Sequence, residues 1–332
     1  MTEHPAPSLN EIKQAANSLQ GKIVNTPVVK LSSDRIAPYL PDGAEMSIKL
    51  ELFQQAGSFK ARGALLSVEA LNEEERQRGI TTVSAGNHAL AASWAANKAG
   101  VHAKVVMTKT ADPIRVAGCR AQGAEVILVE DIHAAFDEVE RIKQEEGRTF
   151  VHPFEGRYLT LGTGTCGYEY ATQVPDLDVA IVPIGGGGLI SGMSTAFKAM
   201  NPKIEVIGVE PYGADSMYRS FQSGQPEKLE KVQTIADSLG SPLAMPYSFA
   251  VAHAHVDRVV RIEDEDMLRG MAVLYDALKI AVEPAGAAST AAAMSVLKEG
   301  LAGKRVGVIA CGSNIGADAF SGYVAKGREL LK

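Results

Sequence analysis

Short apolar runs alternate with amphipathic segments along most of the chain. Residues 80–85 (ITTVSA), 103–107 (AKVVM) and 177–184 (LDVAIVPI) are mainly apolar, and after each of them apolar residues recur at helical spacing. Short apolar strands that alternate with amphipathic helices are typical of parallel sheets covered by helices. The pattern therefore predicts an α/β fold built on open, twisted parallel sheets.

Two interruptions of this alternation indicate domain boundaries. Segments 75–82 (ERQRGITT) and 151–156 (VHPFEG) place glycine, and in the second case also proline, between the regular elements. Domain boundaries usually lie in segments of this kind. We expect a small domain over residues 79–153 and a larger, discontinuous domain made of residues 1–78 and 154–332.

Composition and charge exclude several classes of partner. The 332 residues are 46% hydrophobic and 22% charged, which is ordinary for a globular protein. A formal net charge of −6 without a basic cluster argues against nucleic acid and anionic membranes as partners. No apolar run is long enough to cross a membrane. Few, widely separated cysteines favour a reducing compartment, so we expect a cytoplasmic protein; they are Cys119, Cys166 and Cys311.

The clearest binding motif is a run of four glycines, Gly185, Gly186, Gly187 and Gly188, between an apolar strand and a predicted helix. Side-chain-free amides at a helix N-terminus form a site for an anion such as phosphate. A tight strand–helix turn needs only one or two glycines, so the phosphate-binding interpretation is favoured. No Lys-Ser or Lys-Thr pair follows, which excludes a nucleotide P-loop.

A lysine stands where a helix begins. Residues 59–71 place their apolar side chains on one face of a helix, and Ser58 is expected to cap its N-terminus. Lys60 then falls in the first turn, where a cation is disfavoured by ~0.3–1 kcal/mol. Together with the neighbouring Arg62, this position disfavours the ammonium form of Lys60 and so favours a reactive neutral amine.

Three further motifs are less specific. The loop 83–90 (VSAGNHAL) lies where a strand ends and a helix begins, a common place for ligand binding, but taken alone it is slightly better explained by ordinary helix capping. Residues 162–167 (GTGTCG) match the dinucleotide pattern without a clean strand before them, so packing glycines are favoured. In 253–257 (HAHVD) two histidines would share one face of a strand, and surface histidines are favoured over a metal site.

Several of these segments occur together and in order, and on them the chain resembles the threonine/serine dehydratase and serine racemase family. They are GSFKARGA, TTVSAGNH, IGGGGL and CGSN, together with TPVVKL, HPFEG, VEPYGADS, TIADSL and AVEPAGAAS. The resemblance runs nearly end to end. It implies a fold-type-II pyridoxal-phosphate enzyme, similar to tryptophan synthase β, with the cofactor in the cleft between two domains. It also suggests a homodimer.

The resemblance implies roles for individual residues. Lys60 is implied to form a Schiff base with pyridoxal 5′-phosphate and to move the Cα proton, and Ser84 is the second implied catalytic residue. The other implied cofactor contacts are Phe59, Asn87, Gly185, Gly186, Gly187, Gly188, Leu189, Glu283 and Cys311. The implied contacts of the substrate carboxylate are Ser84, Ala85, Gly86, Asn87 and His88.

Two positions bear on the type of reaction. Cys311 stands where the family has Ser or Cys facing the pyridine nitrogen, and a thiol cannot keep that nitrogen protonated as a carboxylate would. This arrangement suits β-elimination better than transamination. Ala85 stands where racemases of the family carry a second serine, and its methyl group cannot move a proton. Elimination is therefore expected to exceed racemisation.

A cation site is less well matched. Glu210, the Ala214 carbonyl and Ser216 correspond to the ligands of the family's cation site, but Ser216 replaces an acidic residue. Oxygen ligands remain while one negative charge is missing. A divalent or a monovalent cation is therefore left open.

The resemblance implies a dehydratase that converts a β-hydroxy amino acid to a 2-oxo acid and ammonia. L-threonine, L-serine and a 3-hydroxyaspartate-like substrate are all open; Arg157 and Tyr158 could reach an acidic β-substituent, although exposed loop positions are favoured for them. A racemase or a β-replacement synthase of the same fold remains the alternative. The presence of Lys60 argues against a binding protein that has lost the catalytic activity. The hypothesis of a nicotinamide dehydrogenase is supported only by residues 162–167.

Overall fold

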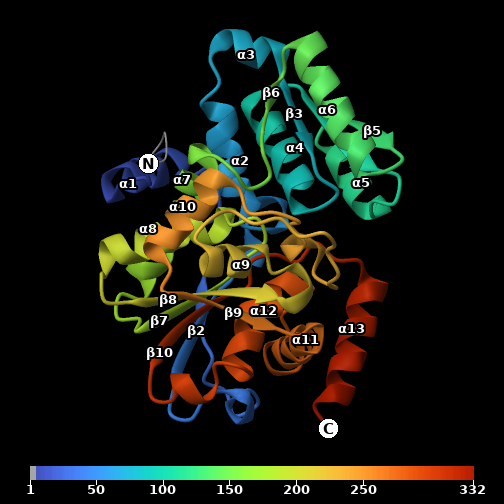
Figure 1. The fold of residues 1–332 in the computed structure, drawn as a ribbon. Coiled ribbons are helices and arrows are strands. Elements are labelled where there is room, and N and C mark those ends of the chain that lie inside the picture. The colour runs from blue at the N-terminus through green and yellow to red at the C-terminus, as the bar shows by residue number, and fades with distance from the viewer. Residues whose placement is uncertain (1–4) are drawn as a thin grey trace.

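The computed structural model describes residues 5–332; residues 1–4 lie outside this description. The strands form a six-stranded and a four-stranded sheet, which occupy the lower and the upper part of the molecule in Figure 1. Every residue of the smaller sheet lies between Ile80 and Phe150. The division into residues 79–153 and the two flanking segments remains a prediction.

The larger sheet joins strands from both ends of the chain. In spatial order it contains β1 (Val28–Lys30), β2 (Glu45–Lys49), β10 (Arg305–Ile309), β7 (Val179–Pro183), β8 (Glu205–Pro211) and β9 (Arg258–Ile262). All neighbours are parallel except β1, which pairs with β2 in the antiparallel sense. The prediction of parallel sheets is confirmed apart from this edge pair, whose strands are connected by residues 31–44.

The smaller sheet is parallel throughout. In spatial order it contains β5 (Glu125–Val129), β4 (Ala103–Thr108), β3 (Ile80–Val83) and β6 (Thr149–Phe150). Its helices begin and end at the residue types that suit these positions. For example, the Asp131 side chain accepts the N–H of Ala134 at the start of α6 (Ile132–Glu146), and Gly147 ends that helix at φ 63°.

Helices cover both sheets. The remaining helices are α1 (Leu9–Leu19), α2 (Lys60–Glu69), α3 (Glu73–Arg78), α4 (Asn87–Ala99), α5 (Pro113–Ala121), α7 (Arg157–Gln173), α8 (Gly188–Met200), α9 (Ser216–Ser223), α10 (Pro246–His255), α11 (Asp264–Leu278), α12 (Pro284–Met294) and α13 (Ala317–Leu330). The 3₁₀ helices are η1 (Ala37–Tyr39), η2 (Glu51–Phe53), η3 (Gln55–Gly57), η4 (Tyr212–Ala214), η5 (Asp237–Leu239) and η6 (Glu299–Leu301). No helix of residues 5–332 has the length and apolar character needed to cross a membrane.

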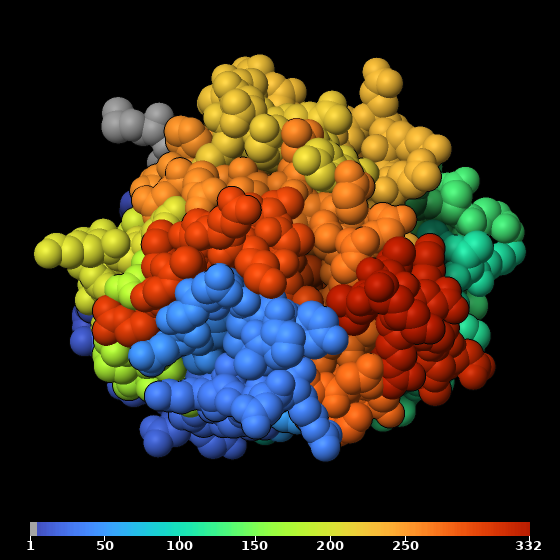
Figure 2. Space-filling view, turned by 90° about the horizontal axis from the view of Figure 1, so that it is seen from below, coloured from blue at the N-terminus to red at the C-terminus, as the bar shows by residue number. Residues whose placement is uncertain are grey.

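Segments far apart in the sequence meet at the base of the larger sheet. In the view from below, the blue segment around β2 lies directly beside the orange-red segment that leads into β10 (Figure 2). The Glu45 N–H donates to the Lys304 carbonyl at 3.0 Å, and the Gly303 N–H donates to the Asp42 carbonyl at 2.9 Å. The N-terminal segment is therefore an integral part of the C-terminal sheet.

Helix α2 connects the two halves of the molecule. It packs against α4 of the smaller unit and against α7 of the larger one. The contact with α7 is so close that a Cβ on Gly162 would lie 2.4 Å from the Cα of Gly63. Residues 162–167 thus lie inside α7, where Gly162 allows close packing against α2. This agrees with the packing role that was favoured for these glycines over a dinucleotide site.

The paired histidines do not lie on a strand. His253 and His255 both belong to α10, and β9 begins only at Arg258, so the shared strand face considered for them does not apply. His253 is exposed and His255 half-buried, in line with the surface histidines that were favoured. The apolar run of residues 249–252 continues the helix, and side chains two positions apart on a helix point in different directions. The His255 Nδ1 atom lies 2.8 Å from the Val251 carbonyl instead.

Candidate active site

Lys60 is the first residue of α2, as predicted, but the helix is not capped by Ser58. Ser58 has extended backbone angles and forms a β-bridge with Gly312, and its buried hydroxyl has no hydrogen-bond partner among residues 5–332. Phe59 occupies the N-cap position without a side-chain hydrogen bond. The expectation of a serine cap was wrong because the pairing with Gly312 turns Ser58 away from the helix.

The amine of Lys60 is buried and has a lowered pKa. Its Nζ donates to the Pro153 carbonyl at 2.5 Å. Burial lowers the pKa of Lys60 to about 8, against the opposing effects of Cys311 and Glu283. Arg62, which we expected to repel this charge, points to Glu51 at 2.7 Å instead. Desolvation, rather than a neighbouring cation, therefore favours the neutral amine.

The lowered pKa predicts when Lys60 reacts with an aldehyde. Only the neutral amine is nucleophilic, so the rate at which cofactor-free enzyme forms a borohydride-reducible adduct with pyridoxal phosphate should rise about tenfold per pH unit up to pH 8. Above that pH the rate should level off. Mass spectrometry of residue 60 after reduction measures the adduct, and a rate still rising at pH 10 would contradict the prediction.

The four glycines form a cradle that no side chain would fit. They follow β7 and lead into α8, and Gly187 has φ 92°. A Cβ on Gly186 would lie 2.2 Å from the ring of Phe154, and one on Gly185 would lie 2.7 Å from the Ser238 carbonyl. Backbone amides are therefore the groups presented at the N-terminus of α8, an arrangement that favours an anion.

Most of the predicted cofactor residues meet in one small cavity of about 30 Å³. It is lined by Phe59, Lys60, Asn87, Phe154, Pro183, Gly185, Gly186, Gly187, Gly188, Leu189, Ser238, Leu239, Ala285 and Cys311. The amine and the amide cradle thus face one space, although far apart in the sequence. Phe154 and Ser238 were not predicted, although both lie in segments that carry the family resemblance.

Cys311 is a neutral thiol at one side of this cavity. Its Sγ donates to the Ala285 carbonyl at 3.4 Å, and the residue is buried. Burial raises the pKa of Cys311 well above its ordinary value, and Glu283 raises it further. This side of the cavity therefore presents a weak hydrogen-bonding group without charge.

Asn87 is held by three side chains. Its Nδ2 donates to Glu283 Oε1 at 2.6 Å and to Ser238 Oγ at 3.1 Å, while its Oδ1 accepts from Asn314 Nδ2 at 2.7 Å. Ser238 Oγ also donates to Glu283 Oε1, at 2.9 Å. Burial raises the pKa of Glu283. Glu283 therefore acts here by orienting Asn87 and Ser238.

The loop predicted to bind a carboxylate offers its backbone rather than its histidine. The Gly86 N–H donates to Ser84 Oγ at 3.1 Å. The His88 ring is buried, with Nε2 3.0 Å from the Val151 carbonyl. Burial, with a further effect of Lys60, lowers the pKa of His88 to about 3, so the ring is neutral. The His88 side chain is therefore a packing group, which leaves the backbone amides for the loop's predicted function.

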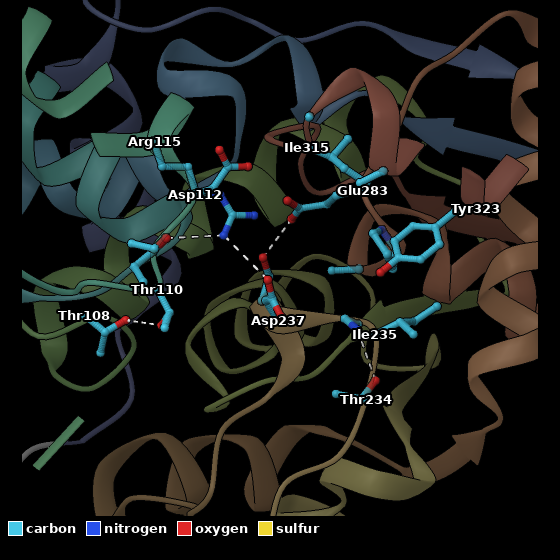
Figure 3. Close-up of a pocket in the computed structure, with 18 residues that line it drawn as sticks. Thr108, Thr110, Asp112, Arg115, Thr234, Ile235, Asp237, Glu283, Ile315 and Tyr323 are labelled. Carbon is cyan, nitrogen blue, oxygen red and sulfur yellow. Dashed lines mark hydrogen bonds and ion pairs between the residues drawn. The ribbon is translucent and has the colours of Figure 1, made fainter. Parts of the chain in front are cut away.

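A larger cavity of about 650 Å³ adjoins the cofactor cavity and shares Ser238 and Ala285 with it. Ala85 lines it from residues 84–88, the loop predicted to bind the substrate carboxylate and called the carboxylate loop below. Figure 3 shows Arg115 of α5 directed toward Asp237 across the cavity. Its walls come from β4 and α5 of the smaller unit and from η5, α12 and α13 of the larger one. The two cavities therefore adjoin each other between the halves of the molecule, and the amine of Lys60 lines the smaller one.

Comparison with known proteins agrees with this geometry. A family model described as "Pyridoxal-phosphate dependent enzyme" matches residues 19–312. The chain belongs to this family. The residues of the Lys60 cavity suit the chemistry of the cofactor, because they combine a buried amine with a side-chain-free anion cradle.

Individual members of the family are similar over nearly the whole chain. The chain is 48% identical to phenylserine dehydratase of Ralstonia pickettii, covering 97% of each chain, and 36% identical to L-threonine ammonia-lyase of Thermotoga maritima, covering 96% of this chain and 79% of the relative. The structure of maize serine racemase superimposes with a TM-score of 0.90 at 34% identity, over 98% of this chain and 99% of that one. The predicted dehydratase and racemase family, its fold type II and a lyase-type enzyme are confirmed.

The Glu210 carboxylate of the expected cation site is engaged by donors of the protein. Both carboxylate oxygens of Glu210 accept backbone N–H groups of α9, from Met217 at 3.0 Å and from Tyr218 at 2.6 Å. Ala214 and Ser216 are also buried, and the Ser216 hydroxyl has no hydrogen-bond partner in the described part of the chain. Within residues 5–332 no three His, Cys, Asp or Glu side chains are arranged to hold a metal ion.

An arginine supplies positive charge beside the expected cation site. Arg261 donates to Asp215 Oδ2 at 3.0 Å, and its guanidinium lies 4.0 Å from the ring centre of Tyr218 and 4.5 Å from that of Tyr212. Asp215 also accepts from Arg219 at 2.8 Å. Asp215 is therefore paired with two arginines, while burial raises the pKa of Glu210 to about 8, so this segment offers little free negative charge.

Cation removal should accordingly have no effect on stability. We expect EDTA, added Mg²⁺ or exchange of K⁺ for Na⁺ to change the Tm of the holoenzyme by less than about 1 °C. A cation bound at a hundred times its Kd would stabilise the protein by about 2.7 kcal/mol, enough to shift the Tm visibly. A rise in Tm that saturates with Mg²⁺ concentration would contradict this expectation.

Arg157 and Tyr158 lie outside the site. They line a separate cavity of about 240 Å³ at the start of α7. Arg157 forms an ion pair with Glu11 of α1 and donates to the Pro5 carbonyl at 2.8 Å. These contacts hold the N-terminal segment, and neither residue lines the cavities next to Lys60.

Proposed function

We propose that this protein is a pyridoxal-phosphate-dependent dehydratase that converts a β-hydroxy amino acid to a 2-oxo acid and ammonia. The observation that carries the proposal is the buried amine of Lys60, whose pKa is lowered to about 8, beside the glycine cradle in the cavity between the sheets. A neutral amine at this position can remove a proton from an amino acid bound in the adjoining cavity.

The cavity residues supply the contacts that the cofactor needs. The amides of the glycine cradle, with that of Leu189, would hold the phosphate, and Phe59 would pack against the ring. Asn87 would bind the phenolic oxygen by exchanging its contact with Ser238, and Cys311 would face the ring nitrogen. When bound, pyridoxal phosphate accepts the electron pair of the broken Cα–H bond.

The chain's own groups then perform the binding and the proton transfers. Ser84 Oγ and the backbone amides of residues 85–88 would bind the substrate carboxylate. Lys60 removes the Cα proton, and the β-hydroxyl leaves as water after gaining a proton. The unsaturated amine that remains takes up water and releases ammonia, so the net products are a 2-oxo acid and ammonia. Acid–base help of this kind is typically worth ~10²–10⁴-fold in rate.

Ala85 and Cys311 favour elimination over the alternatives. Lys60 serves one face of the substrate, and the methyl group of Ala85 offers no proton on the loop that borders it. The neutral thiol of Cys311 does not keep the ring nitrogen protonated, which suits the departure of a β-substituent. A racemase or a β-replacement synthase of the same fold is the second candidate.

The charges of the larger cavity bear on the substrate. Asp112, Asp237 and Glu283 line it together with a single basic residue, Arg115. A second carboxylate on the substrate would gain little from Arg115, because Asp237 lies 3.7 Å from this guanidinium. We propose that neutral β-substituents, as in threonine, serine or phenylserine, are preferred to that of 3-hydroxyaspartate.

A substrate panel tests the proposed function. The holoenzyme is incubated with both configurations of threonine, serine, phenylserine and 3-hydroxyaspartate, and the release of 2-oxo acid and ammonia is followed together with the enantiomer content. We expect equal amounts of both products from at least one neutral substrate and little racemisation. Inversion of configuration without ammonia would overturn the proposal in favour of a racemase.

We also propose a cytoplasmic homodimer. The three cysteines are buried and unpaired, which suits a reducing compartment. The dimer rests on the family resemblance of the sequence.

A further inference from the structure

One guanidinium connects the carboxylate loop to the opposite half of the molecule. Arg115 Nη1 donates to the Ala85 carbonyl at 3.3 Å, and its Nε and Nη2 donate to the Asn314 carbonyl at 3.3 and 2.8 Å. Asp237 Oδ2 lies 3.7 Å from Nη1. The side chain is only 12% exposed and lines the large cavity (Figure 3).

The contact with Ala85 orients the next peptide N–H. The carbonyl of Ala85 and the N–H of Gly86 belong to one planar trans peptide, so they point in opposite directions. Because Arg115 holds the carbonyl on one side, the Gly86 N–H faces the other side, where it meets Ser84 Oγ at 3.1 Å. These two groups are among those proposed to bind the substrate carboxylate.

The contact with Asn314 extends the same network to the cofactor cavity. Asn314 Nδ2 donates to Asn87 Oδ1 at 2.7 Å and to the Ala56 carbonyl at 2.8 Å. Arg115 thus ties α5 of the smaller sheet to a loop of the larger sheet at the point where the loop 84–88 begins. Loss of this residue would free the Ala85–Gly86 peptide to rotate.

We propose that Arg115 is a positioning residue that holds the Ala85–Gly86 peptide in the orientation that binds the substrate carboxylate. The inference rests on the proposed function, since it concerns the same substrate. Arg115 acts through the backbone and lines a different cavity from the amine that performs the proton transfer. Its replacement should therefore weaken amino acid binding and leave the chemical step nearly unchanged.

Arg115→Met and Arg115→Lys test this assignment, with Arg120→Met as the matched control. Arg120 lies on the same helix but is exposed, so its variant removes an equal charge without touching the loop. Binding of L-alanine, which has a carboxylate but no leaving group, is titrated on the holoenzyme by the fluorescence of Trp94, the single tryptophan, located on α4. Cofactor content, kcat and KM are measured in parallel.

We expect Arg115→Met to raise the KM and the L-alanine Kd about tenfold, the size expected for one charge-assisted hydrogen bond, with kcat within about threefold. Arg115→Lys, which keeps the charge and can reach one carbonyl, should lie in between, and Arg120→Met should match the wild type. An unchanged Kd in Arg115→Met, or a lower kcat at unchanged KM, would overturn the assignment. Should Arg115→Met fail to fold, Arg115→Lys decides by the same criterion.

The two proposals fail in different ways. If the wild type releases no 2-oxo acid from any substrate, the dehydratase function is wrong, whereas the L-alanine titration still reports on Arg115. If elimination occurs and Arg115→Met binds L-alanine normally, only the positioning role is wrong.

Discussion

Replacing Lys60 with alanine is expected to abolish the release of 2-oxo acid, with kcat reduced at least about 10³-fold. The substitution removes the buried amine that lines the smaller cavity and would both hold the cofactor and accept the Cα proton. The stability of the cofactor-free protein should change little, because within residues 5–332 the amine makes one hydrogen bond, to the Pro153 carbonyl. Coupled measurement of 2-oxo acid gives the rate.

Lys98→Ala is the matched control for this experiment. Lys98 is exposed in the last turn of α4. Borohydride reduction of the wild type and the control should leave a pyridoxyl group on residue 60, whereas Lys60→Ala should carry none. Activity above a tenth of the wild type in Lys60→Ala, or a pyridoxyl group on another lysine of the wild type, would contradict the proposed mechanism.

Replacing Arg62 with methionine is expected to destabilise the protein by about 3–5 kcal/mol. Arg62 is 1% exposed and forms ion pairs with Glu51 at 2.7 Å and with Glu169 at 3.1 Å. Glu169 also accepts from the buried Lys49 at 2.5 Å. Methionine fills a similar volume but leaves Glu51 buried without its cation, and an unpaired buried charge is costly. Denaturant unfolding of the holoenzyme at neutral pH measures the loss.

Two further variants separate the charge from the packing. Arg62→Met combined with Glu51→Gln removes the unpaired carboxylate and should recover a large part of the lost stability. Arg141→Met breaks surface ion pairs with Glu138 and Glu145 on α6 and should cost less than about 1 kcal/mol. A single Arg62→Met variant as stable as the wild type would show that the buried ion pairs contribute nothing to the fold around Lys60.

The ion pairs of Arg62 also explain why Lys60 is held in a defined position. Arg62 lies two residues after Lys60 on α2, and its ion pairs hold the first turn of that helix against η2 and α7. The close contact between Gly63 and Gly162 fixes the same turn from another side. The amine is therefore positioned by contacts in which it takes no part.

The sequence by itself determined the elements and the local motifs of this protein. Alternating apolar runs and amphipathic segments predicted the strands and helices, since burial of one face follows directly from residue spacing. The glycine run and the lysine at the start of α2 were recognisable because an amide cradle and a helix N-terminus are formed by neighbouring residues. The antiparallel edge strand β1 and the helical His253 escaped prediction, because short segments adopt whichever structure their neighbours impose.

The tertiary structure alone decided the electrostatics and the partners of the site. The pKa of Lys60 is low because the amine is buried and not because Arg62 is adjacent, since Arg62 turns to Glu51. Arg261 reaches the acidic segment after β8, and Arg115 reaches the carboxylate loop, from elements distant in the sequence. Desolvation and contacts between distant residues arise only when the sheets pack. They therefore cannot be predicted from residue spacing along the chain.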